Sequence, residues 1–252
     1  MSPPVRRLVV LASLAAFAGF YLWALAGLPD FGAFHGVYGR IVNHAVVAER
    51  HATNAVSAVN FDYRAFDTLI EELILFTAVA GVMTLLREQR GERRRADERG
   101  GGFGEPGEAS HAVRVFGLVM IAFTLALGIY VTSHGQITPG GGFQGGVLIA
   151  AAVLLVYLAH EYVVVERLRP VPIMEALHAV GAAGFLCVGL GGLIAGEAFF
   201  HNFIALGKPG MLLSGGTIPL NSVAVGLEVT GAFLLLFSEF IEEAVVIGRE
   251  RG

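Results

Sequence analysis

The chain has 252 residues, of which 55% are hydrophobic and only 15% are charged, and its mean hydropathy is +0.67. A soluble domain carries roughly 25% charged residues, so this composition excludes an ordinary soluble domain and indicates membrane helices. The net charge of −4 identifies no partner, and we expect no nucleic acid to bind. The single cysteine, Cys187, excludes an internal disulfide and a multi-cysteine metal site.

Six apolar stretches are each long enough to cross roughly 30 Å of hydrocarbon as an α-helix. The first follows Arg6 and Arg7 and resembles a signal peptide, but its apolar core is too long, so we expect it to be retained. The fold class is therefore an all-α integral membrane protein with six transmembrane helices. The predicted spans are residues 8–28, 66–86, 113–132, 143–165, 173–195 and 218–246.

The basic residues predict the orientation of these spans. If the chain starts in the cytoplasm and crosses six times, 13 of the 17 basic residues face the cytoplasm. Such an excess is the usual rule for cytoplasmic loops. Both termini are therefore predicted to be cytoplasmic.

The distribution of charge divides the chain into two modules. Residues 88–111 are charged, rich in glycine and without apolar periodicity, which is typical of a flexible linker. We expect a two-helix module over residues 1–87, a cytoplasmic linker over 88–111 and a four-helix domain over 112–252. The arginines of the linker suit a membrane surface with anionic lipids, or a docking site for a soluble partner.

Residues 134–146 read HGQITPGGGFQGG and lie between two apolar stretches. Three of the glycines fit the dinucleotide motif G-x-G-x-x-G, but a helix of membrane length follows and no lysine does, so we reject nucleotide binding. We expect instead an outer loop before the fourth helix that dips toward the membrane. Glycines would allow a tight turn, and the polar side chains would satisfy backbone groups. The structural residues of this loop are His134, Pro139, Gly140, Gly141, Gly142 and Gln144.

The stretch HGQITPGGGFQGGVLIAAA resembles the signature of the MnhB family, the B-type subunits of Mrp-type multisubunit cation/proton antiporters. A second stretch, LLSGGTIPLNSVAVGLEV at residues 212–229, resembles another segment of that family. Both lie in the expected order, and the likeness covers most of residues 113–248.

The N-terminal module has a resemblance of its own. The stretch ATNAVSAVNFDYRAFDTLIEE, residues 52–72, is similar to the C-terminal part of the A-type subunit of Mrp antiporters and to the corresponding small subunit of membrane-bound hydrogenases. Ala65 and Ile70 replace glycines of that pattern, whereas its charged positions match, namely Asp62, Arg64, Asp67 and Glu71. The chain therefore resembles a fusion of two pieces that are otherwise separate.

Acidic residues inside the predicted spans are the main candidates for an ion pathway, because a charge in a bilayer is costly unless it is paired or hydrated. Asp67 and Glu71 lie one turn apart on one helix face. Asp67 could instead cap its helix. Glu228 lies about 16 Å along the sixth helix, where it could carry a proton or cation or staple helices as a protonated carboxyl. Weaker candidates are Glu175 and His178, for which a role at an interface is the alternative.

The resemblance implies a subunit of an Mrp-type antiporter that exchanges Na⁺ for H⁺ in the inner (plasma) membrane, together with other membrane subunits. It implies no enzyme activity, cofactor or resident metal in this chain. One alternative is an ion-translocating module of a membrane-bound hydrogenase or a related oxidoreductase similar to complex I. A second alternative is a structural scaffold subunit of the same complex, in which the buried acids serve assembly alone.

Overall fold

The computed structural model describes residues 3–28, 36–86, 111–159 and 171–251, and these form helices and irregular connections without strands. The chain divides into two compact units, Met1–Ile41 and Val42–Gly252. The first unit contains α1 (Pro3–Ala26), which exposes apolar side chains on every face. A helix that is apolar all round suits a lipid environment or a partner's surface. The start of α2 (Val37–Arg50) also belongs to this unit.

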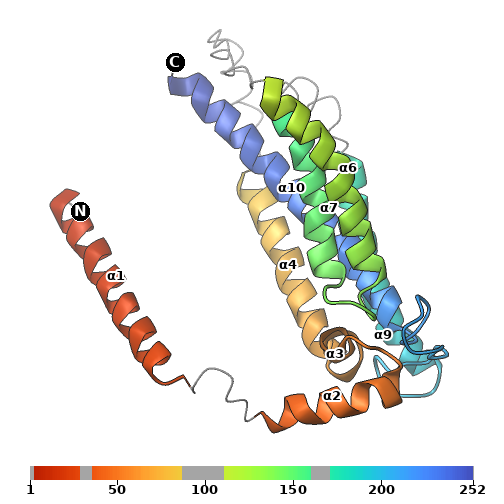
Figure 1. Ribbon diagram of the computed structural model, residues 1–252. Coiled ribbons are helices and arrows are strands. Elements are labelled where there is room, and N and C mark those ends of the chain that lie inside the picture. Colours follow the sequence, from red (N-terminus) through yellow and green to blue (C-terminus); the bar gives the residue numbers. More distant parts are fainter. Residues whose placement is uncertain (1–2, 29–35, 87–110, 160–170, 252) are drawn as a thin grey trace. The chain divides into compact units, whose positions relative to one another are not determined.

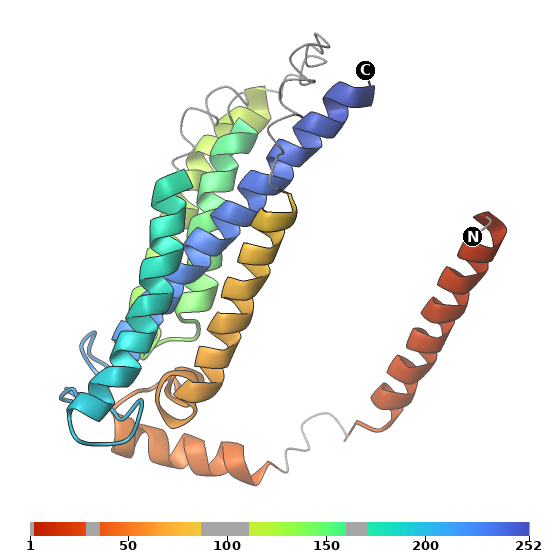
Figure 2. The same cartoon turned by 180° about the vertical axis from the view of Figure 1, so that it is seen from behind.

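The second unit is a bundle of long helices, shown from opposite sides in Figures 1 and 2. Its short elements α3 (Ala55–Ala58) and η1 (Val59–Tyr63, a π-helical turn) lie at one end of the bundle. The long helices are α4 (Ala65–Leu85), α6 (His111–Ser133), α7 (Gly142–Ala159), α9 (Val171–Ile194) and α10 (Ile218–Arg251).

Helix α10 is the centre of this bundle and packs against α4, α6, α7 and α9. In its segment Ile218–Ile241, 67% of the most apolar window is buried, against 17% in α4 and in α6. Most side chains on this part of α10 are therefore enclosed by protein, whereas α4 and α6 expose most of theirs.

Five of the six predicted spans coincide with helices that are long and apolar enough to cross a membrane: α1, α4, α6, α9 and α10. Within the described residues, the fourth predicted span shows only the shorter apolar segment Gly142–Val156. Its end, residues 160–165, lies outside them. The sixth crossing and the orientation of the termini therefore stay predictions. The same holds for the linker and the module boundaries, because residues 88–110 are also outside the described part.

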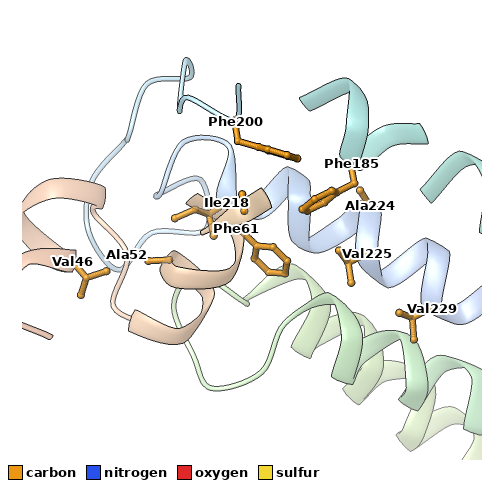
Figure 3. Close-up of a cluster of buried hydrophobic side chains, with 11 residues drawn as sticks. Val46, Ala52, Phe61, Phe185, Phe200, Ile218, Ala224, Val225 and Val229 are labelled. Atoms are coloured by element: carbon orange, nitrogen blue, oxygen red, sulfur yellow. The ribbon is translucent and has the colours of Figure 1, made fainter. Parts of the chain in front are cut away.

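A cluster of buried apolar side chains ties the short elements to the helix bundle (Figure 3). Phe61 of η1 lies edge-on to Phe185 of α9, with 6.3 Å between the ring centroids, and Phe185 is also 5.1 Å from Phe200 in the loop that follows. Val225 and Val229 of α10 continue the cluster along the bundle. Because η1 is held on both α9 and α10, the start of α4 has a fixed position against α10.

Candidate functional site

The turn between α6 and α7 occupies residues 134–141, and Gly140 adopts a φ of 123°, which side chains other than glycine rarely allow. Asn54 holds this turn from outside. Its Nδ2 lies 2.7 Å from the carbonyl oxygen of Gly135 and 2.8 Å from that of Thr138. Its Oδ1 accepts from the backbone N–H groups of Val56 and Ser57, so that Asn54 also caps α3.

The remaining glycines of the motif belong to α7 and let helices approach one another. Gly142 was predicted to lie in the turn, and that prediction is wrong: it is the first residue of α7. A β-carbon there would collide with the backbone of Ser222 and Gly226 in α10. Gly145 abuts α6, and Gly146 abuts α10 near Val229. Small residues at contacts of this kind are how membrane helices come close.

The other residues of the loop differ in their burial and in their contacts. The His134 Nδ1 lies 3.0 Å from the carbonyl oxygen of Tyr130, at the end of α6, and its ring stacks on Tyr130 with 4.2 Å between centroids. Pro139 is exposed, and Gln144 is exposed at the start of α7. Gln136 is fully buried, and its Nε2 donates to the carbonyl oxygen of Leu212 at 2.5 Å. The polar residue at the centre of the loop is therefore Gln136, which the motif alone did not single out.

A cavity of about 430 Å³ lies between the turn, α3, η1, α4 and α10. Its wall is mainly apolar, and the smaller polar part includes Glu71 and Glu72. This volume accommodates several water molecules, each of which takes about 30 Å³ in the liquid. The lining residues are Val56, Ser57, Asn60, Phe61, Thr68, Glu71, Glu72, Leu75, Gly140, Gly141, Phe143, Gln144 and Val225.

The two acids singled out on α4 are both exposed, but they differ in position. Asp67 lies in the first turn and forms an ion pair with Arg64, and α4 begins after Arg64 without a side-chain cap. The interpretation of Asp67 as the helix cap is therefore wrong, although an acid in a first turn still suits the helix dipole. Glu71 lines the cavity one turn further on.

Glu72 is the acid that the sequence pattern did not reveal. It is only 5% exposed and lines the cavity, and no hydrogen-bond donor in the described part of the chain reaches its Oε2. A helical stripe could have identified it, since Ala65, Thr68, Glu72 and Val79 are the buried residues of α4. Asp67 and Glu71 lie on the neighbouring, exposed stripe. Their spacing of four indicates that face of the helix, and Glu72 does not belong to it.

Glu228 is fully buried in α10. Glu72 of α4 lies at the same level of the bundle, because Leu75 packs against the cluster that contains Val225 and Val229 of α10. No donor among the described residues reaches either oxygen of Glu228. On another side of α10, Gly181 allows α9 to approach closely, because a β-carbon at Gly181 would collide with the backbone of Glu228. Glu228 is thus enclosed between α4 and α9.

The structure separates the two weaker candidates. Glu175 is exposed on α9, whereas His178 is 6% exposed, so the two side chains point to different surroundings. The His178 Nδ1 lies 3.3 Å from the backbone oxygen of Glu228, and its ring stacks on Phe76 of α4 with 4.7 Å between centroids. Its buried Nε2 has no hydrogen-bond partner within the residues that the structure describes. His178 therefore joins the Glu72–Glu228 region, and Glu175 does not.

Asp62 serves a structural role beside the cavity. The side chain of Asp62 is 4% exposed, and it accepts from Arg50 Nε at 2.6 Å and from Asn202 Nδ2 at 2.7 Å. Burial lowers the pKa of Arg50, but the hydrogen bond and the charge of Asp62 outweigh it and raise that pKa above its ordinary value. This tie joins α2 and η1 to the loop that follows α9.

The described residues contain no group of three or more His, Cys, Asp or Glu side chains that could hold a metal ion. They do bring together a cavity, the acids Glu71 and Glu72 at its wall, and the buried Glu228 and His178 behind it. Ionisable groups that are enclosed without partners inside a membrane helix bundle are characteristic of ion pathways. The arrangement is suited to receive a cation or a proton from the cavity.

Residues 112–235 match the family described as "Domain related to MnhB subunit of Na+/H+ antiporter". The "Putative antiporter subunit mnhB2" of Staphylococcus haemolyticus is 30% identical over 47% of this chain and 84% of its own length. The chain belongs to the MnhB family. The B-type subunit of the Na(+)/H(+) antiporter of Alkalihalophilus pseudofirmus is 31% identical over 34% of this chain and 58% of its own length.

Two further relatives extend beyond the MnhB segment. The uncharacterized protein MJ1307 of Methanocaldococcus jannaschii is 31% identical over 98% of both chains. A chain of the membrane-bound sulfane sulfur reductase, an archaeal respiratory membrane complex, is 29% identical over 96% of this chain and 98% of its own, with a TM-score of 0.68. The Mrp complex of Dietzia sp. DQ12-45-1b shares the fold, with a TM-score of 0.69 and 22% identity over 95% of this chain and 26% of that one.

These likenesses place the chain among multi-pass membrane proteins, in agreement with its apolar helices. As a member of the MnhB family, it is a membrane subunit of the cation-antiporter type. The MnhB match begins at residue 112, so the family description leaves α1 to α4 uncovered, together with Glu71 and Glu72. The relatives matched over the whole chain include that part as well.

Proposed function

We propose that this chain lines an ion pathway in an Mrp-type antiporter module that exchanges Na⁺ for H⁺, within a complex of several membrane subunits in the plasma membrane. Glu71 and Glu72 collect the ion at the cavity, and Glu228 receives it inside the bundle. Asp67 contributes negative charge near the entrance. The chain itself carries out no chemical conversion and uses no cofactor.

One observation carries the proposal: Glu72 of α4 and Glu228 of α10 are both buried where these helices pack, and no donor among the described residues reaches Glu72 Oε2 or either oxygen of Glu228. A scaffold role does not require such a pair, because apolar residues of similar volume would pack the contact at less cost than two buried carboxyl groups. Glu72 lines a cavity that also contains Glu71, and this cavity gives the mobile ion an approach.

A second candidate is the same module inside a respiratory membrane complex, where electron transfer in other subunits drives the ion movement. The likeness over 98% of the length of a chain of the sulfane sulfur reductase favours it, because the MnhB relatives match this chain over only a third to a half. The two candidates share the ion pathway and differ in the partners.

Purification of the intact complex in mild detergent separates the two candidates. Large antiporter-like subunits without iron–sulfur absorption support the stand-alone antiporter. Co-purification of subunits with iron–sulfur absorption supports the respiratory complex, and a chain recovered without partner subunits contradicts both.

The ion pathway itself is tested in vesicles that contain the complex. We expect Glu71→Gln and Glu228→Gln to slow Na⁺-dependent dissipation of a pH gradient by at least about tenfold, since an amide neither binds a proton nor carries charge. The control is Glu197→Gln, which makes the same change at an exposed position in the loop after α9. Full exchange by assembled Glu71→Gln and Glu228→Gln complexes would leave only the scaffold role.

A further inference from the structure

The contact between α4 and α10 is apolar on the side of Glu72 and Glu228 that faces away from the cavity. Leu75 of α4 packs against the cluster that contains Val225 and Val229 of α10, one residue to three residues away from Glu228. One turn further, Val79 and Ala232 belong to the next buried cluster. The two carboxyl groups therefore meet in an apolar contact, where water enters only from the cavity beside Glu72.

Few charged or titratable groups face this pair. α4 contributes Glu71 at the cavity, and α9 contributes His178, whose Nδ1 bonds the backbone oxygen of Glu228. α7 has no charged residue between Gly142 and Ala159. η1 contributes Asn60 to the cavity wall, and its Asp62 forms an ion pair with Arg50. α6 carries Arg114 at the end remote from the glycine turn. α4, α7, α9 and Ile218–Ile241 of α10 contain no lysine or arginine.

Two carboxyl groups that face each other in such a place cannot both be ionised, because like charges without a counter-ion repel strongly in an apolar surrounding. Carboxylate oxygens are acceptors only, so a hydrogen bond between Glu72 and Glu228 requires a proton on one of them. This explains why neither oxygen of Glu228 has a donor among the described residues while its neighbour is another acid.

We propose that Glu72 and Glu228 share a single proton and that this pair passes protons, and not metal cations, from the cavity into the interior of the bundle. The inference rests on the proposed function, which it deepens by naming the ion at this point. In the transfer, the O–H bond of Glu72 breaks as an O–H bond forms on Glu228. Glu228 then releases this proton to the neighbouring imidazole of His178, whose Nε2 has no partner among the described residues, and returns to a carboxylate. Glu72, left as a carboxylate by the first transfer, takes the next proton from hydronium in the cavity or from protonated Glu71, which becomes a carboxylate in turn.

The surroundings of Glu228 favour a proton over a dehydrated metal cation. A bare cation requires several oxygen ligands to replace its hydration shell. Around Glu228 the structure offers apolar Val225 and Val229 and the close backbone at Gly181. The Thr230 hydroxyl is already committed to the carbonyl oxygen of Gly226 at 2.7 Å. A proton requires only the two carboxyl groups and an approach for water, and both are present.

Infrared spectroscopy of the intact complex tests the shared proton directly. We expect a protonated-carboxyl C=O band at neutral pH that shifts in deuterated water and is lost in Glu228→Gln and in Glu72→Gln. Glu197→Gln is the matched control and should leave the band unchanged. A spectrum in which neither pair variant removes a protonated-carboxyl band would overturn the inference, because both acids would then be ionised.

Flux measurements in vesicles test the identity of the ion. We expect Glu72→Gln and Glu228→Gln to slow proton movement by at least about tenfold and to slow Na⁺/Na⁺ exchange at clamped pH much less. Loss of Na⁺/Na⁺ exchange to the same extent would overturn the inference but leave the ion pathway standing. Retention of both fluxes in all variants, Glu71→Gln included, would overturn the inference and the proposed function together.

A second pair of variants covers the case in which an amide prevents assembly. Glu72→Asp and Glu228→Asp keep an acid and shorten it by one methylene group. They should preserve the protonated-carboxyl band at a shifted frequency and slow proton movement. An unshifted band with unchanged proton movement contradicts a proton held between the two side chains.

Discussion

The side-chain amide of Asn54 donates to the carbonyl oxygen of Gly135 at 2.7 Å, across 81 residues of chain. The same amide reaches Thr138, and its oxygen caps α3. One buried side chain thus connects the start of α3, which leads through η1 into α4, to the glycine turn before α7. Both segments contribute to the wall of the cavity beside Glu71 and Glu72, so Asn54 holds two parts of that wall together.

Replacement of Asn54 by aspartate should therefore destabilise the bundle. Aspartate keeps the oxygen that caps α3 but replaces the donor with an acceptor that faces two carbonyl oxygens. We expect a loss of about 2–4 kcal/mol, because buried carbonyl groups and a buried charge would be left without partners. Thermal unfolding of the purified complex measures it. Asn43→Asp, at an exposed position of α2, should change the melting temperature little; equal effects would mean that the amide donor is unimportant.

The glycine pattern makes a second prediction, for α7 against α10. A β-carbon at Gly146 would lie 2.8 Å from the carbonyl oxygen of Gly226 and 2.8 Å from Cβ of Val229. Gly146→Ala should therefore push the helices apart and destabilise the protein by about 1–3 kcal/mol. Gly81→Ala makes the same change in α4, where no atom lies within 4 Å of the added carbon. It should be neutral or stabilising by up to about 1 kcal/mol, and the difference in melting temperature between the two variants is the measurement.

The third prediction concerns the ion pair between Arg50 and Asp62. Arg50→Met removes the charged partner of an acid whose side chain is only 4% exposed, so we expect a loss of about 1.5–3 kcal/mol. Arg64→Met removes the partner of Asp67, where both side chains are more than half exposed, and should cost at most about 1 kcal/mol. Chemical denaturation of the two variants in the same detergent compares them. A larger loss in Arg64→Met would contradict the structural role of Asp62.

Composition and periodicity were sufficient to predict an all-helical membrane protein, because a span of about 20 apolar residues has few other interpretations. They predicted five helices that the structure contains, and the burial of Glu228. They could not predict its partner, since Glu72 and Glu228 are joined by packing between distant helices. The helical stripe of α4 was available in the sequence, but it identifies a face and not the helix that covers it.

The polar contacts at the glycine turn were beyond sequence reasoning for a related reason. His134 and Gln144 were chosen because they lie inside the motif, whereas Asn54 lies 81 residues before Gly135 and acts from another element. Gln136 lies in the same motif as Gln144, but the residue type alone does not show that the amide of Gln136 is buried and that of Gln144 is exposed. Long-range hydrogen bonds depend on how the chain is arranged in space, which the local pattern does not contain.

The last prediction concerns the pH dependence of the contact between Tyr63 and Glu49, which lies outside the spans. The Tyr63 hydroxyl donates to Glu49 Oε2 at 2.8 Å, and the guanidinium carbon of Arg50 lies 4.8 Å from the ring centroid. Burial raises the pKa of Tyr63 to about 12, the hydrogen bond and negative charge of Glu49 act in the same direction, and Arg50 opposes them. The pKa in the unfolded chain is about 10.

Because the folded-state pKa is the higher one, neutral Tyr63 stabilises the fold fully below about pH 10, and this contribution is lost as the pH rises to about 12. The measurement is the tyrosinate absorbance of the unmodified protein minus that of Tyr63→Phe, which isolates one of the 6 tyrosines. We expect the midpoint of this difference near pH 12, and a lower midpoint in Glu49→Gln, which removes the neighbouring negative charge. A midpoint near pH 10 in the unmodified protein would show that the hydroxyl is solvated and that Glu49 does not hold its proton.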